Sequence, residues 1–242
     1  MQDFSDLSAV FVNCSLKKDK TKSHTGRLLA HAAAVMEHNN VHVDHLYAMD
    51  YTIAFGMSPD MTEHGWEKDD WPALYKRVVD ADILVLGTPI WLGVKSSVCT
   101  QFIERLYSNS SCENAQGQYI YYGKTGGCLV TGNEDGVKAV AMEVLYAMQH
   151  IGFTIPPAAD AGWIGEAGPG PSYGDTDDGG GAPVGFDNEF TNRNTTIMSY
   201  NLMHVARILK DLGGFPTLGN RIDGWSKDNR FGYPLDASGR RI

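Results

Sequence analysis

Short apolar runs alternate with longer helical patterns along the 242 residues of this chain. A continuous apolar run of about four residues is typical of a strand covered on both faces, whereas apolar positions that recur every three to four residues predict an amphipathic helix. These patterns predict strands at 9–12, 41–47, 83–86, 127–131 and 153–158. They predict helices at 24–38, at 70–79, from about 97 onward, at 137–151 and at 194–212.

This alternation predicts an α/β fold in which helices cover both faces of a five-stranded parallel sheet. We expect a single domain over 1–242, with a core of about 8–213, a Gly- and Asp-rich insertion at about 162–191 and a tail at 214–242. In sheets of this kind, ligands bind beyond the carboxyl ends of the strands. The residues that follow each predicted strand are therefore the candidates for a site.

Composition narrows the class of protein. The chain carries 20 Lys and Arg against 29 Asp and Glu, a net charge of −9, which argues against a nucleic-acid-binding protein. The chain has one basic cluster, Lys17, Lys18, Lys20 and Lys22 in the first predicted loop, which is short and interrupted by Asp19. An apolar run of about 18 residues is missing, so we expect no membrane span. The acidic and polar first residues do not resemble a signal peptide. The four cysteines form no CxxC pair, which predicts free thiols in the cytoplasm.

Three hydroxyl residues, Ser15, Ser23 and Thr25, lie between the first predicted strand and the start of the 24–38 helix. The free N–H groups and the positive dipole end of a helix favour an anion, and hydroxyl groups add donors without adding charge. They predict a cradle for a single phosphate, although a simple helix cap at Ser23 or Thr25 explains the pattern equally well. The loop has neither the Walker A nor the GxGxxG pattern, so it does not predict a site for a nucleoside triphosphate or a dinucleotide diphosphate.

Two later loops combine glycine with aromatic or polar residues, at 87–93 and 131–136. Glycine permits close approach of the backbone to a ligand, so these loops predict walls for a flat ring system. For Trp91 alone, packing in the core or at a subunit interface is the better interpretation. Trp163 would line the same crevice or serve an interface. His42 and His45 have no third residue at metal-ligand spacing, so we predict no metal site.

In these motifs the chain resembles the flavodoxin-like NAD(P)H-dependent FMN reductases, which include the quinone reductases. The matching pieces occur in the family's order and spacing over about residues 8–165, and the Thr-Pro-Ile-aromatic loop is the most specific of them. The resemblance implies a three-layer flavodoxin-like fold with strand order 2-1-3-4-5. The chain departs from the family pattern in two places, the long, Lys-rich first loop and residues 166–242. We expect these regions to determine which electron acceptor is used and how subunits assemble.

The resemblance also implies a set of FMN-binding residues. It assigns the phosphate to Ser15, Ser23, His24 and Thr25. It assigns the isoalloxazine ring to Pro89, Ile90, Trp91, Leu92 and Gly93, and the other edge of the ring to Thr131, Gly132, Asn133 and Gly136.

The implied activity is transfer of a hydride from NADPH or NADH to FMN, and from there to a quinone or another small acceptor. The flavin carries this chemistry, so no catalytic side chain is predicted. The resemblance further implies a homodimer or homotetramer. Two alternatives remain at this point: a flavodoxin-type carrier that binds FMN without nicotinamide turnover, and an α/β interaction protein without FMN.

Overall fold

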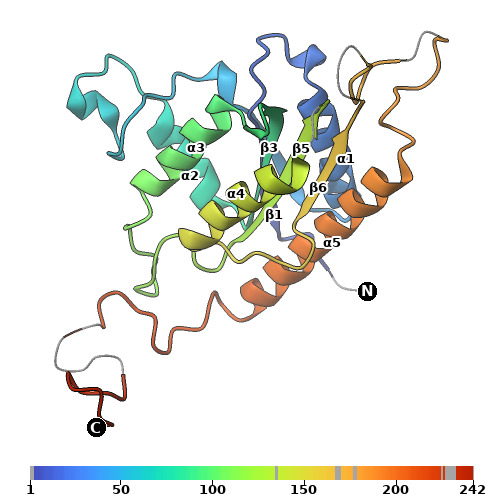
Figure 1. Ribbon diagram of the computed structural model, residues 1–242. Helices are drawn as coiled ribbons and strands as arrows, with labels where there is room; N and C mark the ends of the chain where they lie inside the picture. The colour runs from blue at the N-terminus through green and yellow to red at the C-terminus, as the bar shows by residue number, and fades with distance from the viewer. Residues whose placement is uncertain are drawn as a thin grey trace.

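A computed structural model describes residues 3–133, 136–166, 170–176, 179–224, 226 and 233–241. A sheet forms the middle layer, with helices on both of its faces (Figure 1). Its strands are β1 Ser8–Asn13, β2 His42–Tyr47, β3 Ile83–Trp91, β4 Val94–Lys95, β5 Thr125–Gly132 and β6 Asp160–Ile164. Its α-helices are α1 His24–His38, α2 Trp71–Asp80, α3 Ser97–Ser108, α4 Val137–His150 and α5 Glu189–Asp211.

The sheet has the order β2-β1-β3-β5-β6, and these five strands are parallel. Since β5 and β6 are the fourth and fifth parallel strands along the chain, the predicted order 2-1-3-4-5 is confirmed. Alternate residues of β3 serve opposite faces: Leu84 and Leu86 join one core cluster, and Ile83 and Val85 join the other. A strand buried on both sides explains why its sequence is a continuous apolar run.

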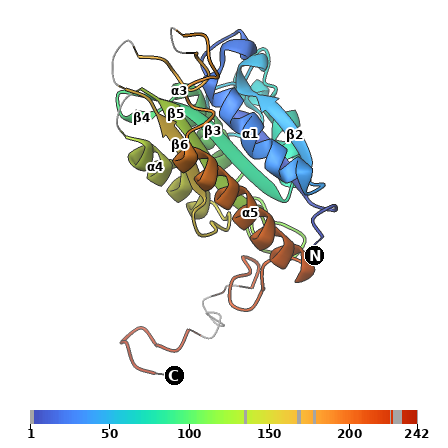
Figure 2. The same cartoon turned by 90° about the vertical axis from the view of Figure 1, so that its right-hand side faces the viewer.

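The two core clusters show which helices cover which face. Apolar residues of α2, α3 and α4 pack on one face, and those of α1 and α5 pack on the other. The two views in Figures 1 and 2 show α1 and α5 together on their own side of the sheet. The amphipathic patterns in the sequence therefore correspond to the buried stripes of these helices.

Strand β3 extends further than the sequence predicts. The apolar run ends at Leu86, but β3 continues to Trp91 and turns back as β4 through a two-residue hairpin. Both turn residues have positive φ, +52° at Leu92 and +76° at Gly93, as a type I′ hairpin requires. The segment read as a loop from its Gly, Thr and Pro residues is thus a strand end and a rigid hairpin.

The fifth predicted strand, at 153–158, is wrong. The strand that completes the sheet is β6, and Thr154 makes only an isolated bridge to Thr125. Pro156 and Pro157 have no N–H to donate to a ladder, and Ala158 has a φ of +49°. The chain therefore turns before it pairs with β5, which moves the strand several residues along the sequence.

The last helix begins earlier than predicted. Asn188 caps α5 by accepting a hydrogen bond from the amide of Thr191 at 2.9 Å, so the helix starts at Glu189. Beyond the helix the chain runs back to the body of the fold, where Gln116 and Gln118 donate to the carbonyls of Gly213 and Pro216. Residues 233–241 lie away from the sheet (Figures 1 and 2).

The four cysteines are free thiols, three of them buried. Cys14, Cys99 and Cys128 belong to the core cluster on the α2–α4 face. An interaction with Cys99, together with burial, raises the pKa of Cys14 well above its usual value. Burial likewise raises the pKa of Cys128. The thiols of Cys14 and Cys128 are therefore held in their neutral form at neutral pH.

Candidate functional site

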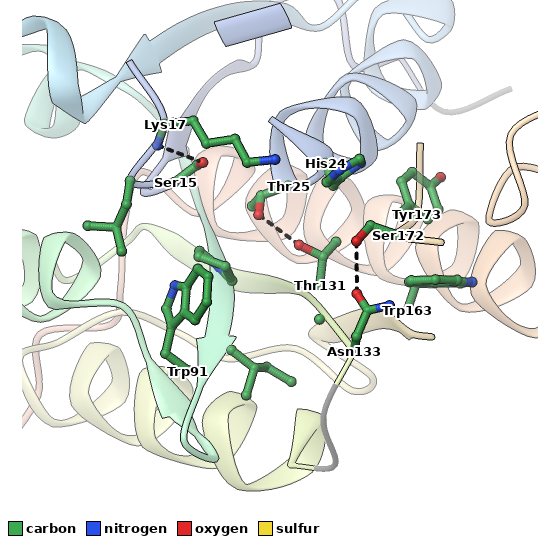
Figure 3. A pocket seen from close by; sticks show the side chains of 14 residues that line it. Ser15, Lys17, His24, Thr25, Trp91, Thr131, Asn133, Trp163, Ser172 and Tyr173 are labelled. Atoms are coloured by element: carbon green, nitrogen blue, oxygen red, sulfur yellow. Dashed lines mark hydrogen bonds between the residues drawn. The ribbon is translucent and has the colours of Figure 1, made fainter. Parts of the chain in front are cut away.

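A cavity of about 200 Å3, partly open to solvent, lies at the carboxyl edge of the sheet (Figure 3). Six segments meet around it: the loop after β1, the start of α1, the ends of β3, β5 and β6, and a segment beyond β6. Nine of the thirteen sequence-predicted site residues line it: Ser15, His24, Thr25, Pro89, Ile90, Trp91, Thr131, Gly132 and Asn133. The topology explains this meeting, because parallel strands end at one edge.

Two hydroxyl groups from distant parts of the chain meet in this cavity. Thr25 in the first turn of α1 and Thr131 near the end of β5 are both buried, and their Oγ1 atoms lie 2.7 Å apart (Figure 3). Only one of the two hydroxyl hydrogens is used in this contact, so the other is available to an acceptor in the cavity.

The start of α1 offers backbone donors on the same side. Ser23 caps the helix by accepting from the amide of Gly26 at 3.0 Å, and the amide of Arg27 binds the carbonyl of Ser23. The first N–H groups of a helix have no intrahelical acceptor. The amides of His24 and Thr25 are therefore available to donate hydrogen bonds to an anion that lies before the start of the helix.

Ser23 itself is turned away from the cavity. Its Oγ accepts from Asn13 Nδ2 at 3.0 Å and from the Gly26 amide, inside the scaffold behind the loop. The helix-cap interpretation of the hydroxyl pattern is therefore confirmed for Ser23. Ser23 is the helix cap, while Ser15 and Thr25 line the cavity.

The hairpin between β3 and β4 forms the aromatic wall. Trp91 lines the cavity and is 53% exposed, while Leu92, at the tip, is 91% exposed. Neither Leu92, Gly93 nor Gly136 is among the residues that line the cavity. A Cβ on Gly136 would lie 3.3 Å from the Gly93 backbone, so this pair lets the start of α4 approach the hairpin closely. Glu134 and Asp135, in the same predicted motif, lie outside the described residues.

A segment far along the chain closes the cavity on the α1 side. We call residues 170–176 the strap. Its Ser172 Oγ donates to Asn133 Oδ1 at 2.9 Å, and Asn133 Nδ2 donates to the Pro171 carbonyl at 3.0 Å (Figure 3). The side chain of Asn133 is therefore engaged by the strap on both its oxygen and its nitrogen.

Three residues of α1 hold the strap from the other side. His24 Nδ1 accepts from the Gly174 amide at 3.0 Å, and Arg27 donates to the Gly174 carbonyl. One turn further, His31 Nδ1 lies 2.7 Å from the hydroxyl of the buried Tyr173. Spacings of three and four residues place these side chains on one face of the helix.

The two histidines of this face have lowered pKa values. Burial is the main cause for both, and for His24 the cations Lys17 and Arg27 add to it while Asp175, at 3.6 Å from Nε2, opposes it. Both rings are thus favoured in the neutral form, which leaves Nδ1 free to accept a hydrogen bond from the strap.

Five lining residues were not among the predicted ligands: Leu16, Lys17, Trp163, Ser172 and Tyr173. Lys17 belongs to the basic cluster visible in the sequence, and its Nζ donates to the Lys22 carbonyl at 2.8 Å across the loop. Trp163 lies on β6, against Tyr173. Ser172 and Tyr173 reach the site only through tertiary contacts, so no local signal marks them.

Comparison with known proteins places this site in a family. The sequence profile of the NADPH-dependent FMN reductases matches residues 8–163, more than half of the chain. The chain therefore belongs to the NADPH-dependent FMN reductase family. The predicted family, the flavodoxin-like fold and the cofactors FMN and NAD(P)H are confirmed. The family is one of flavin-dependent oxidoreductases.

Two curated proteins are similar over most of the chain. A Mycobacterium bovis protein named divalent metal cation transporter MntH is 59% identical over 207 residues, 86% of this chain. The chain spans 30% of the length of that relative. The second relative is 8-demethyl-8-aminoriboflavin-5'-phosphate synthase of Streptomyces davaonensis, 32% identical over 85% of this chain and 79% of that protein.

One solved structure is also similar to this chain. The crystal structure of RosB, with the bound intermediate 8-demethyl-8-formylriboflavin-5'-phosphate, is 30% identical and covers 88% of this chain and 83% of its own. The TM-score is 0.76. Among the described residues, no helix is long and apolar enough to cross a membrane.

Proposed function

We propose that this protein uses FMN in the cavity to pass a hydride from NADPH or NADH to a small acceptor such as a quinone. The observation that supports this most directly is the pair of buried hydroxyls, Thr25 and Thr131, facing an aromatic wall across one cavity. Uncharged donors at a helix start suit one phosphate, and the wall suits a flat ring. When bound, FMN supplies the hydride chemistry.

The residues present fit FMN in two parts. Ser15, Thr25 and the first amides of α1 would hold the phosphate, with Lys17 close by. Pro89, Ile90 and Trp91 would lie along the ring on the hairpin side, with Thr131 and Gly132 at its other edge. The chain's own part is to orient the ring and to exclude water from one of its faces.

Four of the predicted ligands, Ser23, Leu92, Gly93 and Gly136, are not among the residues that line the cavity, so we propose that they support the loops instead of contacting FMN. Asn133 would reach the ring only if its contacts with Pro171 and Ser172 were exchanged.

Anaerobic titration of the purified protein with NADPH and then a quinone tests the proposal. We expect bleaching of the flavin absorbance by NADPH and its recovery on adding the quinone, with steady-state turnover. FMN that stays oxidised in the presence of either nicotinamide would contradict the proposal. It would favour a flavodoxin-type carrier.

A second candidate function follows from the similarity to RosB and the Streptomyces synthase. Their names describe riboflavin 5'-phosphate altered at C8, so FMN would there be a substrate rather than a resident cofactor. Mass spectrometry of the flavin after prolonged incubation separates the candidates. An unchanged flavin after many turnovers supports the oxidoreductase, and a flavin with an altered mass supports the second candidate.

We also propose a homodimer or homotetramer in the cytoplasm. An apolar surface supports the assembly, with Leu92 and Val94 on the hairpin and Met142 and Tyr146 on α4, 67% and 66% exposed. The ion pair Lys95–Glu143 at 2.8 Å joins the two elements. Light scattering should show a multimer that Leu92→Glu dissociates; a monomeric wild-type protein would overturn this assembly.

A further inference from the structure

A second cavity lies on the opposite side of the loop that follows β1. It is a groove of about 350 Å3 between α1 and the edge strand β2, two elements that run side by side in Figure 2. Ser15, His24 and Thr25 face the first cavity, whereas Asn13, Ser23 and Gly26 line the groove. The two cavities are therefore back to back across the first turn of α1.

The groove combines an aromatic floor with a cationic rim. Phe11, Tyr47 and Tyr51 supply rings, and the cations Lys20 and Arg27 are among the lining residues. Lys20 Nζ lies 5.6 Å from the centre of the Tyr47 ring. Gathered cations are notable in a chain whose net charge is −9. Such a surface fits a ligand that carries both a heteroaromatic ring and a phosphate.

Lys20 and Arg27, the cations at the rim of the groove, retain hydrogen-bond donors that can bind a phosphate. Lys20 pairs with Asp50, the acidic residue of the lining, and Arg27 donates to the carbonyls of Thr21 and Gly174. A lysine has three donors and an arginine five. These contacts can therefore be shared with an incoming anion.

The loop between the cavities is a basic ridge. Lys17 lines the first cavity, Lys18 is exposed, and Lys20 lines the groove, so three lysines, with Asp19 among them, extend from one cavity to the other. This is the Lys-rich segment by which the sequence departs from the family pattern. A diphosphate lying across the loop would meet these lysines.

We propose that the groove binds the adenosine end of NADPH, with the diphosphate across the lysine ridge and the nicotinamide reaching the first cavity. The adenine would lie on the aromatic floor and the 2'-phosphate beside Lys20 and Arg27. This inference rests on the proposed oxidoreductase function, because it places the reductant of that reaction.

Two pairs of variants test the groove. Ala30 is exposed on α1 and lines the groove, while Ala34 is exposed one turn further along and does not line it. Ala30→Trp fills the groove, and Ala34→Trp is its matched control. Lys20→Gln removes a rim charge, and Lys22→Gln removes a charge from the same loop outside the groove.

Calorimetric titration with adenosine 2',5'-bisphosphate is the first measurement, and KM for NADPH and NADH is the second. We expect Ala30→Trp to abolish binding of the bisphosphate and to raise KM for both nucleotides about tenfold, with kcat and FMN affinity unchanged. We expect Lys20→Gln to raise KM about tenfold for NADPH and much less for NADH, which has no 2'-phosphate. The two control variants should behave as the wild type does.

The outcomes separate this inference from the proposed function. Normal NADPH oxidation with an unchanged KM in Ala30→Trp would overturn the groove assignment and leave the oxidoreductase function standing. Equal effects of Lys20→Gln and Lys22→Gln would overturn the assignment of the 2'-phosphate. A wild-type protein that never oxidises NADPH would overturn both proposals together.

Discussion

Two hydroxyl residues that the sequence places two positions apart have different roles in the structure. Ser23 stabilises the start of α1 from within the scaffold, and Thr25 faces the cavity beside Thr131. A sequence pattern shows that hydroxyls gather at a helix start, but the side on which each one lies depends on the turn that precedes the helix. The two roles can be separated by measuring affinity and stability independently.

We predict that Thr25→Ala weakens FMN binding about tenfold or more, because a hydrogen bond to a charged phosphate is lost. Thr25→Ser should retain most of the affinity. Ser23→Ala should instead lower the free energy of unfolding by about 1 kcal/mol through the lost cap. Fluorescence titration with FMN and urea unfolding measure the two effects. Equal losses of FMN affinity in both alanine variants would contradict this division.

Among the elements, the strap depends on two neutral histidines of α1. Burial lowers the pKa of His24 and His31 from 6.5, so the folded protein binds fewer protons than the unfolded chain below that pH. The stability that these rings contribute is present above pH 6.5 and is lost as the pH falls through the lowered values. Protonation also removes the Nδ1 acceptor that Gly174 and Tyr173 use.

We therefore predict that hydrogen exchange in residues 170–176 becomes faster as the pH falls from 7 to 5, after correction for intrinsic exchange. The double variant His24→Asn, His31→Asn, which keeps a side-chain acceptor at each position, should lose most of this pH dependence. His38→Asn, at an exposed position of the same helix, is the control. Strap protection that is independent of pH in the wild type would contradict the prediction.

The long connection between β2 and α2 depends on one buried ion pair. Arg105 and Asp69 have side chains that are 0% exposed, and their atoms Nη2 and Oδ2 lie 2.7 Å apart. Arg105 also donates to the carbonyls of Gly56 and Pro59. One arginine of α3 thus fixes a segment that has little regular structure of its own.

We predict that Arg105→Met lowers the free energy of unfolding by about 3–5 kcal/mol, because it leaves the Asp69 carboxylate buried without its partner. Arg77→Met, which breaks a partly exposed pair with Asp44, should cost about 1 kcal/mol or less. Urea unfolding of both variants gives the comparison. Similar losses of unfolding free energy in the two variants would show that the buried Arg105–Asp69 pair contributes no more than the partly exposed Arg77–Asp44 pair.

Sequence patterns predicted the elements whose local signals agree with their tertiary environment. The apolar run of β3 and the helical stripe of α1 are examples, and both form as expected. The β6 strand was misplaced because residues 153–158 are apolar enough for a strand while Pro156 and Pro157 prevent pairing. In the site, loops after strands were predictable from topology, whereas the strap was not, because Ser172 and Tyr173 reach the cavity only through contacts with Asn133 and α1.

For the whole molecule, FMN should act as a stabilising ligand. A ligand at 100 times its Kd adds about 2.7 kcal/mol to the free energy of unfolding. For a chain of this size that corresponds to a rise in Tm of roughly 5–10 °C. We predict such a rise in scanning fluorimetry with FMN, and a much smaller one with riboflavin, which has no phosphate. Equal shifts for the two compounds would argue against the phosphate cradle.

The burial of the core thiols determines which cysteines of the protein are open to oxidation. Flavins take part in oxygen chemistry, and sulfur oxidation follows thiolate character and solvent access. Cys14, Cys99 and Cys128 are buried, and the pKa values of Cys14 and Cys128 are raised, which leaves Cys112, at a partly exposed position, as the accessible thiol. We predict that iodoacetamide labels the native protein at Cys112 alone, by mass spectrometry, and that labelling of the other three marks global unfolding. The fold thereby keeps three of its four thiols out of reach of oxidants dissolved in the solvent.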